Sequence, residues 1–500
     1  MKKYILAIDQ GTTGTTSMIF DREGNVLAKV NEEFPQYFPE SGWVEHDPEE
    51  IWQSALSVVG KALASAGISA RELAALGITN QRETSVFWRK GTTEPVGRAI
   101  VWQCRRSAEI CRRLRSQGME EEIRERTGLV LDPYFSGTKI VWMMENDPEF
   151  ARMAVAGELS FGTVDSWLLC RLTGGRIHAT DYSNASRTLL FNIKDIQWDG
   201  RLLEVLGVPG EILPEVRESS GILGETDPDV FFGQAVPIGG LAGDQQAALF
   251  GQACYRKGMT KNTYGTGSFL LMNTGEELVR SRSGMLTTIA WGLDNRVMYA
   301  LEGSIFVTGA AIQWLRDGLH VIESAEEAGP LAGQVDDTGG VYFVPALVGL
   351  GAPYWDPYAR GAIIGISRGT SREHIVRATV EAMAYQTRDV LEAMESDAGM
   401  GVTSLRVDGG ASVMDILLQF QADLLGVQVQ RPVVPDTTAL GAAYLAGLAA
   451  GYWESLEEIE EIWRADKTFE PSAASEIMES KYRGWKKAVE RARHWEEPGC

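Results

Sequence analysis

The sequence lacks the features that mark secreted, membrane-spanning and nucleic-acid-binding proteins. Only 5 of its 500 residues are cysteine and no Cys-x-x-Cys occurs, so we expect neither a disulfide framework nor a zinc ribbon. The apolar residues 5–8 end at Asp9, too early for a signal peptide, and no run approaches the roughly 18 residues of a membrane helix. With 47 Lys and Arg against 68 Asp and Glu, the net charge of −21 argues against a broad phosphate-backbone footprint. We therefore expect a cytoplasmic protein that does not bind nucleic acid and does not insert stably into a membrane, although backbone N–H groups could hold one small anion.

Several catalytic signatures are also absent. There is no Walker A sequence, no Gly-x-Gly-x-x-Gly after a strand and no Gly-x-Ser-x-Gly. P-loop ATPases, dinucleotide-dependent enzymes and serine hydrolases therefore have no support. The 5 histidines are scattered without metal-ligand spacing. What remains is an acidic globular chain, 44% hydrophobic, whose length suits two to four domains.

The two halves of the chain open in the same way. Two apolar segments flank a first Gly/Thr turn at residues 10–16, which predicts two strands joined by that turn. A second Gly/Thr turn, residues 264–268, lies in a strand-like segment of the second half. The repetition predicts a duplicated α/β architecture, with an N-terminal domain of residues 1–252 and a C-terminal domain of residues 253–500.

Capping signals predict two helices. Asp47, followed by a proline, precedes apolar residues at helical spacing, and Gly67 follows them, so a helix should lie between the two. Thr370 and Glu373 form a capping-box pattern at the start of a long helix. The charged segment from Trp453 onwards predicts a solvated terminal helix.

The first Gly/Thr turn has two interpretations. It is either a hairpin turn and nothing more, as most such turns are, or an anion site. Glycines let several backbone N–H groups face one anion, and threonine hydroxyls add donors. Asp9, at the end of the preceding strand, could hold Mg²⁺ through water.

Two further segments place charged side chains after a predicted strand. Arg82 and Glu83 offer a donor fork and an acceptor to a hydroxyl-bearing ligand, or they form a surface ion pair. Asp244 follows a glycine-rich segment and either caps a helix or acts as a general base. Such a base takes a proton from a substrate hydroxyl during phosphoryl transfer.

Taken together, these segments resemble the glycerol kinases, a branch of the FGGY sugar-kinase family, which shares the fold of actin and the heat-shock ATPases. The resemblance rests on ordered motifs at residues 7–13, 42–48, 80–84, 101–103, 242–252, 262–267 and 352–361. It implies an α/β fold of two ribonuclease-H-like domains with an interdomain cleft. It also implies ATP-dependent phosphorylation of glycerol to sn-glycerol 3-phosphate with Mg²⁺, in a homodimer or homotetramer.

The resemblance implies roles residue by residue. Asp244 matches the catalytic base, and Asp9 and Asp244 match the residues near Mg²⁺. The positions that match the family's glycerol-binding residues are Arg82, Glu83, Trp102, Tyr134, Asp244, Gln245 and Phe269. Those that match its phosphate- and nucleotide-binding residues are Thr12, Thr13, Gly14, Thr266, Gly309, Gln313, Gly410 and Met414.

A few positions depart from the family pattern. Thr16 stands where an arginine is common, which removes a cation near the phosphates. Met414 stands where an asparagine is common, which removes an amide near the adenine, although a methionine can still pack on a purine face. Residues 230–237 lack the Gly-Thr-Arg of a sugar-bisphosphate site, and Val230 replaces a histidine that is phosphorylated in some members. We expect neither form of control.

Two other functions stay open at this point. A sister kinase that acts on a longer polyol or ketose would share the fold and the ATP site. The aromatic box assigned to the pocket suits three carbons, which favours glycerol. A catalytically weakened, ATP-responsive binding protein is motivated only by Thr16 and Met414, and such a protein would need no general base.

Overall fold

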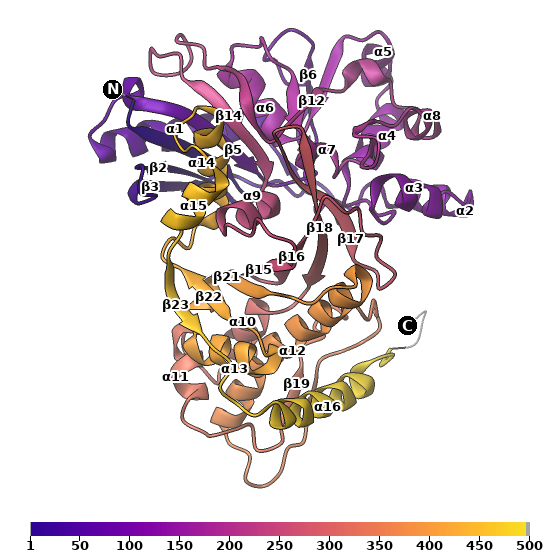
Figure 1. Ribbon diagram of the computed structural model, residues 1–500. Helices are drawn as coiled ribbons and strands as arrows, with labels where there is room; N and C mark the ends of the chain where they lie inside the picture. Colours follow the sequence, from indigo (N-terminus) through magenta and orange to yellow (C-terminus); the bar gives the residue numbers. More distant parts are fainter. Residues whose placement is uncertain (1, 497–500) are drawn as a thin grey trace.

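The first half of the chain folds around a six-stranded mixed sheet (Figure 1). In the computed structural model, which describes residues 2–496, its strands lie in the order β13 (Ser220–Glu225), β14 (Pro237–Gly243), β5 (Leu73–Asn80), β1 (Tyr4–Gln10), β2 (Gly14–Phe20) and β3 (Val26–Glu33). Successive strand side chains point to opposite faces, so Leu6 and Ile8 pack into one hydrophobic core while Ile5 and Ala7 pack into another. β1 is therefore buried on both faces.

Helices cover both faces of this sheet. They are α1 (Pro48–Ala66) and α6 (Val164–Leu172) on one face, and α9 (Asp244–Gly251) and α14 (Thr437–Ala449) on the other. α1 begins and ends as predicted. The Asp47 carboxylate accepts a hydrogen bond from the Glu49 N–H at 2.8 Å, and Gly67 ends the helix with a φ of 66°.

Within residues 45–217 the chain adds a group of helices and short strands beside the first sheet. The helices are α2 (Ala108–Ser116), α3 (Glu120–Thr127), α4 (Ser136–Asn146), α5 (Pro148–Val155), α7 (Tyr182–Ala185) and α8 (Gly200–Leu206). The strand pairs are β4 (Glu45–His46) with β7 (Ala99–Ile100), β6 (Val86–Arg89) with β8 (Leu159–Gly162), β9 (Ala179–Asp181) with β12 (Glu215–Arg217), and β10 (Phe191–Asn192) with β11 (Gln197–Trp198). Among these elements, α2, α3, α4, α5, α8, β6, β7 and β8 share a hydrophobic core of their own.

The second half of the chain forms a seven-stranded sheet whose central strands are arranged as in the first sheet. Its strands are β17 (Leu286–Leu293), β18 (Arg296–Ile305), β16 (Ser268–Gly275), β15 (Met259–Tyr264), β21 (Ser404–Gly409), β22 (Val429–Pro432) and β23 (Ala465–Phe469). In each sheet three antiparallel neighbours, β1–β2–β3 or β15–β16–β18, stand beside two parallel strands, β5 and β14 or β21 and β22. The predicted duplication is therefore present in the topology.

Further helices and one strand pair complete the second body. They are α10 (Gly309–Asp317), α11 (Ala328–Ala332), α12 (Arg372–Ala398), α13 (Asp415–Leu425) and α16 (Ser475–Ala492), with β19 (Tyr342–Val344) and β20 (Ala362–Ile364). The predicted capping box of α12 is wrong by one position, because Ser371 precedes the helix and His374 completes the box. The hydroxyl of Thr370 accepts a hydrogen bond from the Ser367 N–H at 2.9 Å in the preceding turn, so it does not cap the helix.

The predicted C-terminal helix is present as α16 (Ser475–Ala492), but the prediction that it is solvated is wrong for one of its faces. β23 extends the second sheet, and α16 packs into the main core of the second body. Trp485 of α16 stacks on Tyr385 with ring centroids 5.3 Å apart, and its Nε1 donates to Asp389 Oδ2 at 2.7 Å. The remaining helix, α15 (Leu456–Ile462), packs with α9 and α14 in the core of the opposite body.

α14 crosses α9 with their backbones in close contact. A Cβ on Gly441 would lie 1.8 Å from the carbonyl oxygen of Ala247, and a Cβ on Gly251 would lie 2.0 Å from that of Thr437. Only glycine permits this approach. α9 also packs on β15, β16 and β17, so one layer of helices lies between the two sheets. α14 comes late in the chain but completes the first body, as Figure 1 shows.

No helix among residues 2–496 combines the length and the hydrophobicity needed to cross a bilayer. α12 is a continuous helix of 27 residues, but Arg, Glu and Asp residues along it break up its hydrophobic sequence. Its buried positions pack inside the second body instead.

Candidate active site

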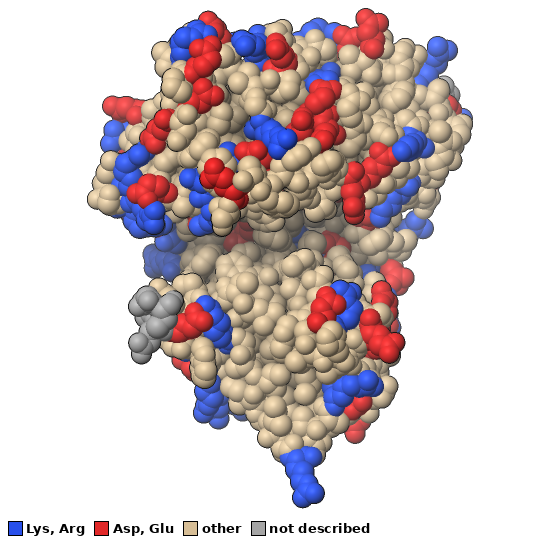
Figure 2. Space-filling view, turned by 180° about the vertical axis from the view of Figure 1, so that it is seen from behind, with Lys and Arg blue, Asp and Glu red and all other residues tan. Residues whose placement is uncertain are grey.

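The carboxyl ends of three parallel strands meet at one edge of the first sheet. Gln10 of β1 pairs with Asn80 of β5, and Asn80 pairs with Gly243 of β14. The chain then continues into the first Gly/Thr turn, the Arg82–Glu83 pair and Asp244, respectively. Ligand crevices commonly lie outside such strand ends. On the face of the molecule seen in Figure 2, the surface is hollowed at the waist between the two bodies.

Hydrogen bonds fix the first Gly/Thr turn. The Gly11 N–H donates to the Gly14 carbonyl at 2.9 Å, and the Trp102 Nε1 donates to Thr12 Oγ1 at 2.9 Å. A Cβ on Gly14 would lie 2.7 Å from a carbonyl oxygen of β3, so a side chain there would force the hairpin apart. Thr13 is exposed at the tip. The turn is thus held to Trp102 by a side-chain hydrogen bond, and its role as an anion site stays a prediction.

Gln81 links this turn to a buried histidine. The Gln81 Nε2 donates to the Gly11 carbonyl and to Gln10 Oε1, both at 3.1 Å, and lies 3.3 Å from His46 Nδ1. Burial lowers the pKa of His46 from 6.5 to about 4. The ring is therefore neutral at neutral pH and can accept a hydrogen bond from Gln81.

We expect acidification to destabilise the fold through His46. Its unfolded-state pKa is near 6.5 and its folded-state pKa is about 4, so its contribution to stability is complete above pH 6.5 and is lost as the pH falls towards 4. The loss amounts to about 2 kcal/mol at about pH 5. Urea unfolding at pH 8 and 5 measures it: His46→Gln should reduce the pH dependence, whereas the exposed control His320→Gln should retain it. Equal pH dependence in both variants would contradict this assignment.

Arg82 is the centre of a buried ion-pair network. Its Nε lies 3.1 Å from Asp244 Oδ1, and its two Nη atoms donate to the two carboxylate oxygens of Glu302 on β18. Arg187 donates from Nε to Glu83 Oε1 at 2.6 Å and from Nη2 to Glu302 Oε1 at 3.0 Å. Only Asp244 is substantially exposed, at 31% of its side chain, against at most 3% for the others. The predicted alternative of a surface ion pair is therefore wrong for Arg82 and Glu83.

Asp244 and Glu83 are the carboxylates at the two ends of this network, and each keeps one oxygen without a hydrogen bond from the described residues. Among residues 2–496, Asp244 Oδ2 and Glu83 Oε2 accept no hydrogen bond, because Oδ1 and Oε1 make the contacts to arginine. Asp244 is the first residue of α9, and Gly243 occupies the capping position, so the predicted helix-cap role of Asp244 is wrong. Two free carboxylate oxygens beside a buried guanidinium are suited to bind and deprotonate hydroxyl groups.

Aromatic side chains lie beside this network. Trp102 and Tyr134 pack edge to face with ring centroids 5.4 Å apart, and the Arg187 guanidinium lies 5.8 Å from the Tyr134 ring centre. Phe269 of β16 pairs with Ser304 of β18, so it shares a face of the second sheet with Glu302. Gln245, next to Asp244, accepts a hydrogen bond from Lys261 Nζ. The structure thus brings the seven predicted substrate residues to the surroundings of one network.

Asp9 lies on β1 at the same edge of the sheet. Burial, helped by the neighbouring carboxylates of Asp244 and Asp436 and opposed by Lys29, raises its pKa to about 7. Among residues 2–496 no group of three or more His, Cys, Asp and Glu side chains could enclose a metal ion. Mg²⁺ is usually held by one or two carboxylates, water and substrate phosphates, and it would relieve this repulsion. The donor set of Asp9 and Asp244 therefore fits Mg²⁺.

The predicted nucleotide residues lie around the corresponding edge of the second sheet. Tyr264 of β15 pairs with Gly409 of β21, whose φ is 86°, and a Cβ on Gly409 would lie 2.3 Å from the Tyr264 carbonyl. The Gly309 N–H, at the start of α10, donates to the Gly265 carbonyl at 3.0 Å. α10 therefore begins directly against the second Gly/Thr turn, which includes the exposed Thr266.

The other predicted nucleotide residues are more open. Gln313 is exposed on α10, and Gly410 is exposed directly after β21. Met414 precedes α13 and is half-buried beside Gly329 of α11. Thr16, the other departure, pairs with Asp9 across β1 and β2, and its hydroxyl accepts a hydrogen bond from Asn31 Nδ2 at 2.8 Å. Contact of these residues with a nucleotide stays a prediction.

Sequence reasoning missed three charged residues of this region. Arg187 and Glu302 belong to the network, and Lys261 is fully buried, with its pKa lowered to about 8 by burial. Glu302 could have been found as a charged residue inside an otherwise apolar segment, because such charges are rarely buried without a partner, whereas Arg187 and Lys261 have mostly polar neighbours in the sequence and give no such signal. Their partners, however, lie far away in the sequence.

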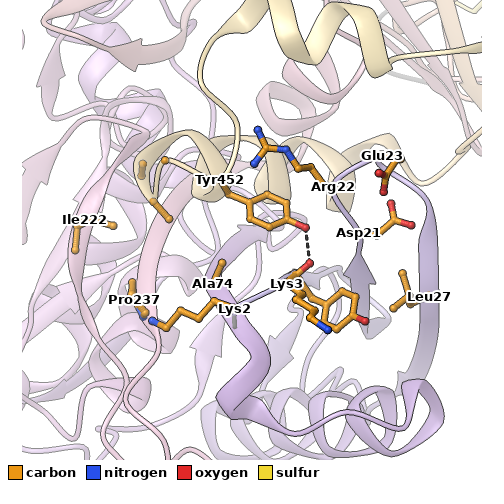
Figure 3. A pocket seen from close by; sticks show the side chains of 14 residues that line it. Lys2, Lys3, Asp21, Arg22, Glu23, Leu27, Ala74, Ile222, Pro237 and Tyr452 are labelled. Atoms are coloured by element: carbon orange, nitrogen blue, oxygen red, sulfur yellow. Dashed lines mark hydrogen bonds between the residues drawn. The ribbon is translucent and has the colours of Figure 1, made fainter.

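An open pocket of about 970 Å³ lies elsewhere, beside the amino-terminal end of β1 (Figure 3). Its walls include Lys2, Lys3, Asp21, Arg22, Glu23, Leu27, Ala74, Ile222, Pro237 and Tyr452. The Tyr452 hydroxyl donates to the Lys3 carbonyl, and Arg22 forms an ion pair with Glu458. None of the predicted site residues lines it, so it is not the candidate active site.

Matches to known proteins extend over nearly the whole chain. The N-terminal and C-terminal domain profiles of the FGGY family of carbohydrate kinases match residues 4–251 and 260–450. Glycerol kinase 2 of Thermotoga maritima is 61% identical over 99% of this chain and 100% of that protein, and the glycerol kinase of Caldanaerobacter subterraneus is 59% identical with the same coverage. The structure of Plasmodium falciparum glycerol kinase with ADP matches with a TM-score of 0.92, 35% identity and 98% coverage of each chain.

The fold extends to more distant structures. Xylulose kinase of Lactobacillus acidophilus matches with a TM-score of 0.85 at 21% identity over 98% of this chain and 97% of that one. At this identity the match shows the fold alone. The predicted two-domain, actin-like α/β fold is confirmed. The chain belongs to the FGGY family of carbohydrate kinases.

Proposed function

We propose that this protein transfers the γ-phosphoryl group of ATP to glycerol, which yields sn-glycerol 3-phosphate and ADP. One observation carries the proposal: Asp244 and Glu83 each present a free carboxylate oxygen at the two ends of the buried Arg82 network. Glycerol kinases that are 57–61% identical over 99% of the chain support it.

The residues at this edge divide the work of binding and proton transfer. Arg82 and Glu83 bind glycerol hydroxyls, while Trp102 and Tyr134 pack against the carbon chain, with Phe269 and Gln245 completing the pocket. Asp244 Oδ2 takes the proton of the attacking glycerol hydroxyl. The hydroxyl oxygen bonds to the γ-phosphorus, and the bond from this phosphorus to the ADP oxygen breaks. Arg82 keeps the Asp244 carboxylate oriented by binding its other oxygen.

In this proposal the first Gly/Thr turn and the second body bind the nucleotide. Thr12, Thr13 and Gly14 face the phosphates, and the nucleoside side is formed by Thr266, Gly309, Gln313, Gly410 and Met414. Asp9 and Asp244 would hold Mg²⁺ through water, and the bound ion would neutralise phosphate charge.

The proposal includes the organisation of the chain. Residues 1–252 and 253–500 form the two domains, with α14 and α15 returning to pack against the first. We further propose a cytoplasmic homodimer or homotetramer, which sedimentation velocity would test.

A substrate panel tests the proposed function. ADP release with ATP and Mg²⁺ is measured for glycerol, dihydroxyacetone, erythritol, xylulose and gluconate, and we expect fast turnover on glycerol. Fast turnover on xylulose or gluconate without glycerol would contradict the proposal. That outcome is not favoured, because relatives named glycerol kinase are 57–61% identical to this chain. Absence of all turnover in a folded, glycerol-binding protein would support a regulatory binding protein instead.

A further inference from the structure

The network that holds Arg82 takes one of its members from the second body. Glu302 lies on β18, 220 residues after Arg82 in the sequence, and its side chain is 3% exposed. It accepts hydrogen bonds from both Nη atoms of Arg82, the second at 3.2 Å, and from Arg187 Nη2 at 3.0 Å. Among residues 2–496 no other carboxylate accepts hydrogen bonds from both arginines. Glu302 is therefore the point at which β18 reaches the proposed glycerol site.

The charge of Glu302 is maintained by these contacts. Burial alone would raise its pKa, but Arg187 and Arg82 outweigh burial and lower the pKa to about 2. The carboxylate is thus ionised across the physiological range. A buried guanidinium that loses such a partner binds whatever acceptor lies nearest, because an unpaired buried charge is costly.

Besides Glu302, three acceptors lie near Arg82: Gln246, whose Oε1 accepts from Nη1 at 3.2 Å, and the two carboxylates that the substrate needs. The Arg82 Nε already lies 3.1 Å from Asp244 and 4.0 Å from Glu83. Glu302 draws both Nη atoms of Arg82 towards β18, which leaves Asp244 Oδ2 and Glu83 Oε2 free. Arg187 links Glu302 to Glu83, because it donates hydrogen bonds to both, and so it occupies Glu83 Oε1 and leaves Oε2 for the substrate.

We propose that Glu302 is a positioning residue that orients Arg82 directly, and Glu83 through Arg187, for binding the acceptor hydroxyls. The inference rests on the proposed function of this site. It means that the glycerol site is completed by the second body, although the proposed glycerol-binding residues, apart from Phe269, lie in the first half of the chain. Glu302 itself touches no substrate in this proposal.

Glu302→Gln tests the inference, because it keeps the shape of the side chain and removes its charge. We expect the KM for glycerol to rise about 10-fold or more, as for loss of a charged hydrogen bond, while the KM for ATP stays within about 2-fold. Glu381→Gln is the matched control. Glu381 is an equally buried carboxylate of the second body and binds Arg377 Nε at 2.9 Å on α12. This control should leave the KM for glycerol unchanged.

The possible results separate the two proposals. Wild-type protein that shows no turnover of glycerol contradicts the proposed function. Active wild-type protein together with an unchanged glycerol KM in Glu302→Gln overturns the inference alone. Equal increases in both KM values, reproduced by Glu381→Gln, would assign Glu302 a general structural role and overturn it as well.

A second variant covers the case in which Glu302→Gln does not fold. Arg187→Lys keeps the positive charge but loses the planar fork that spans Glu83 and Glu302. A selective rise in the glycerol KM of this variant supports the inference, and unchanged KM values overturn it.

Discussion

Asp244→Asn is expected to lower kcat for glycerol phosphorylation by about 10²–10⁴-fold while the fold stays intact. An amide has the size of the carboxylate and its oxygen can still accept from Arg82 and from the Gln245 N–H, which donates to Oδ1 at 2.7 Å. It cannot take the proton of the attacking hydroxyl. The expected loss therefore falls on the chemical step, and the KM for glycerol should change only a few-fold.

Steady-state ADP release, with circular dichroism to verify folding, measures this effect. Asp147→Asn is the matched control, because Asp147 also lies at a helix start, where it accepts hydrogen bonds from the Glu149 and Phe150 N–H groups. Asparagine caps helices as well as aspartate does, so this variant should retain wild-type kcat. Turnover of a folded Asp244→Asn protein within about 10-fold of wild type would rule out the general-base role.

Gly441→Ala is expected to lower the free energy of unfolding by about 3 kcal/mol, although alanine is the better helix former. The new Cβ would lie 1.8 Å from the Ala247 carbonyl oxygen and 2.9 Å from the Gly251 nitrogen. Both atoms belong to a helix backbone, which cannot rotate away as a side chain would. α9 and α14 must therefore separate, and the core that they share opens.

Gly200→Ala provides the control with the opposite expected sign. Gly200 lies in α8, and a Cβ there would meet no atom within 4 Å. The substitution should leave stability unchanged or raise it by up to about 1 kcal/mol. Urea unfolding of the two variants measures both effects, and a Gly441→Ala protein as stable as wild type would show that the helices adapt without cost.

Local signals predicted much of the fold because each depends on neighbours in the chain. Asp47 and Gly67 bound α1 as expected, and the apolar run at residues 5–8 located β1. Residues at the ends of parallel strands also came together as expected, because strand direction alone decides which edge they share. The capping box of α12 failed by one residue because Thr370 and Ser371 both suit the position, and only the backbone turn decides between them.

Long-range pairing was not accessible in the same way. Glu302 stands out as a charge in an apolar segment, but its pairing with Arg187 depends on how the two halves of the chain pack together. α16 is a different case. Its buried Tyr482, Trp485 and Val489 recur at intervals of three and four residues, so a helix with one buried face was predictable despite its charge.

The crossing of α9 and α14 has a consequence for protein synthesis. α9 ends at Gly251 and α14 ends at Ala449, so 198 residues must be translated between them. At about 5–20 residues per second this takes about 10–40 s. During that interval the face of the first sheet around Gly77 lacks α14, whose Ala442 carbonyl packs against Gly77 in the finished protein. The nascent first body therefore exposes an apolar surface, to which chaperones can bind, until the ribosome has synthesised most of the second body.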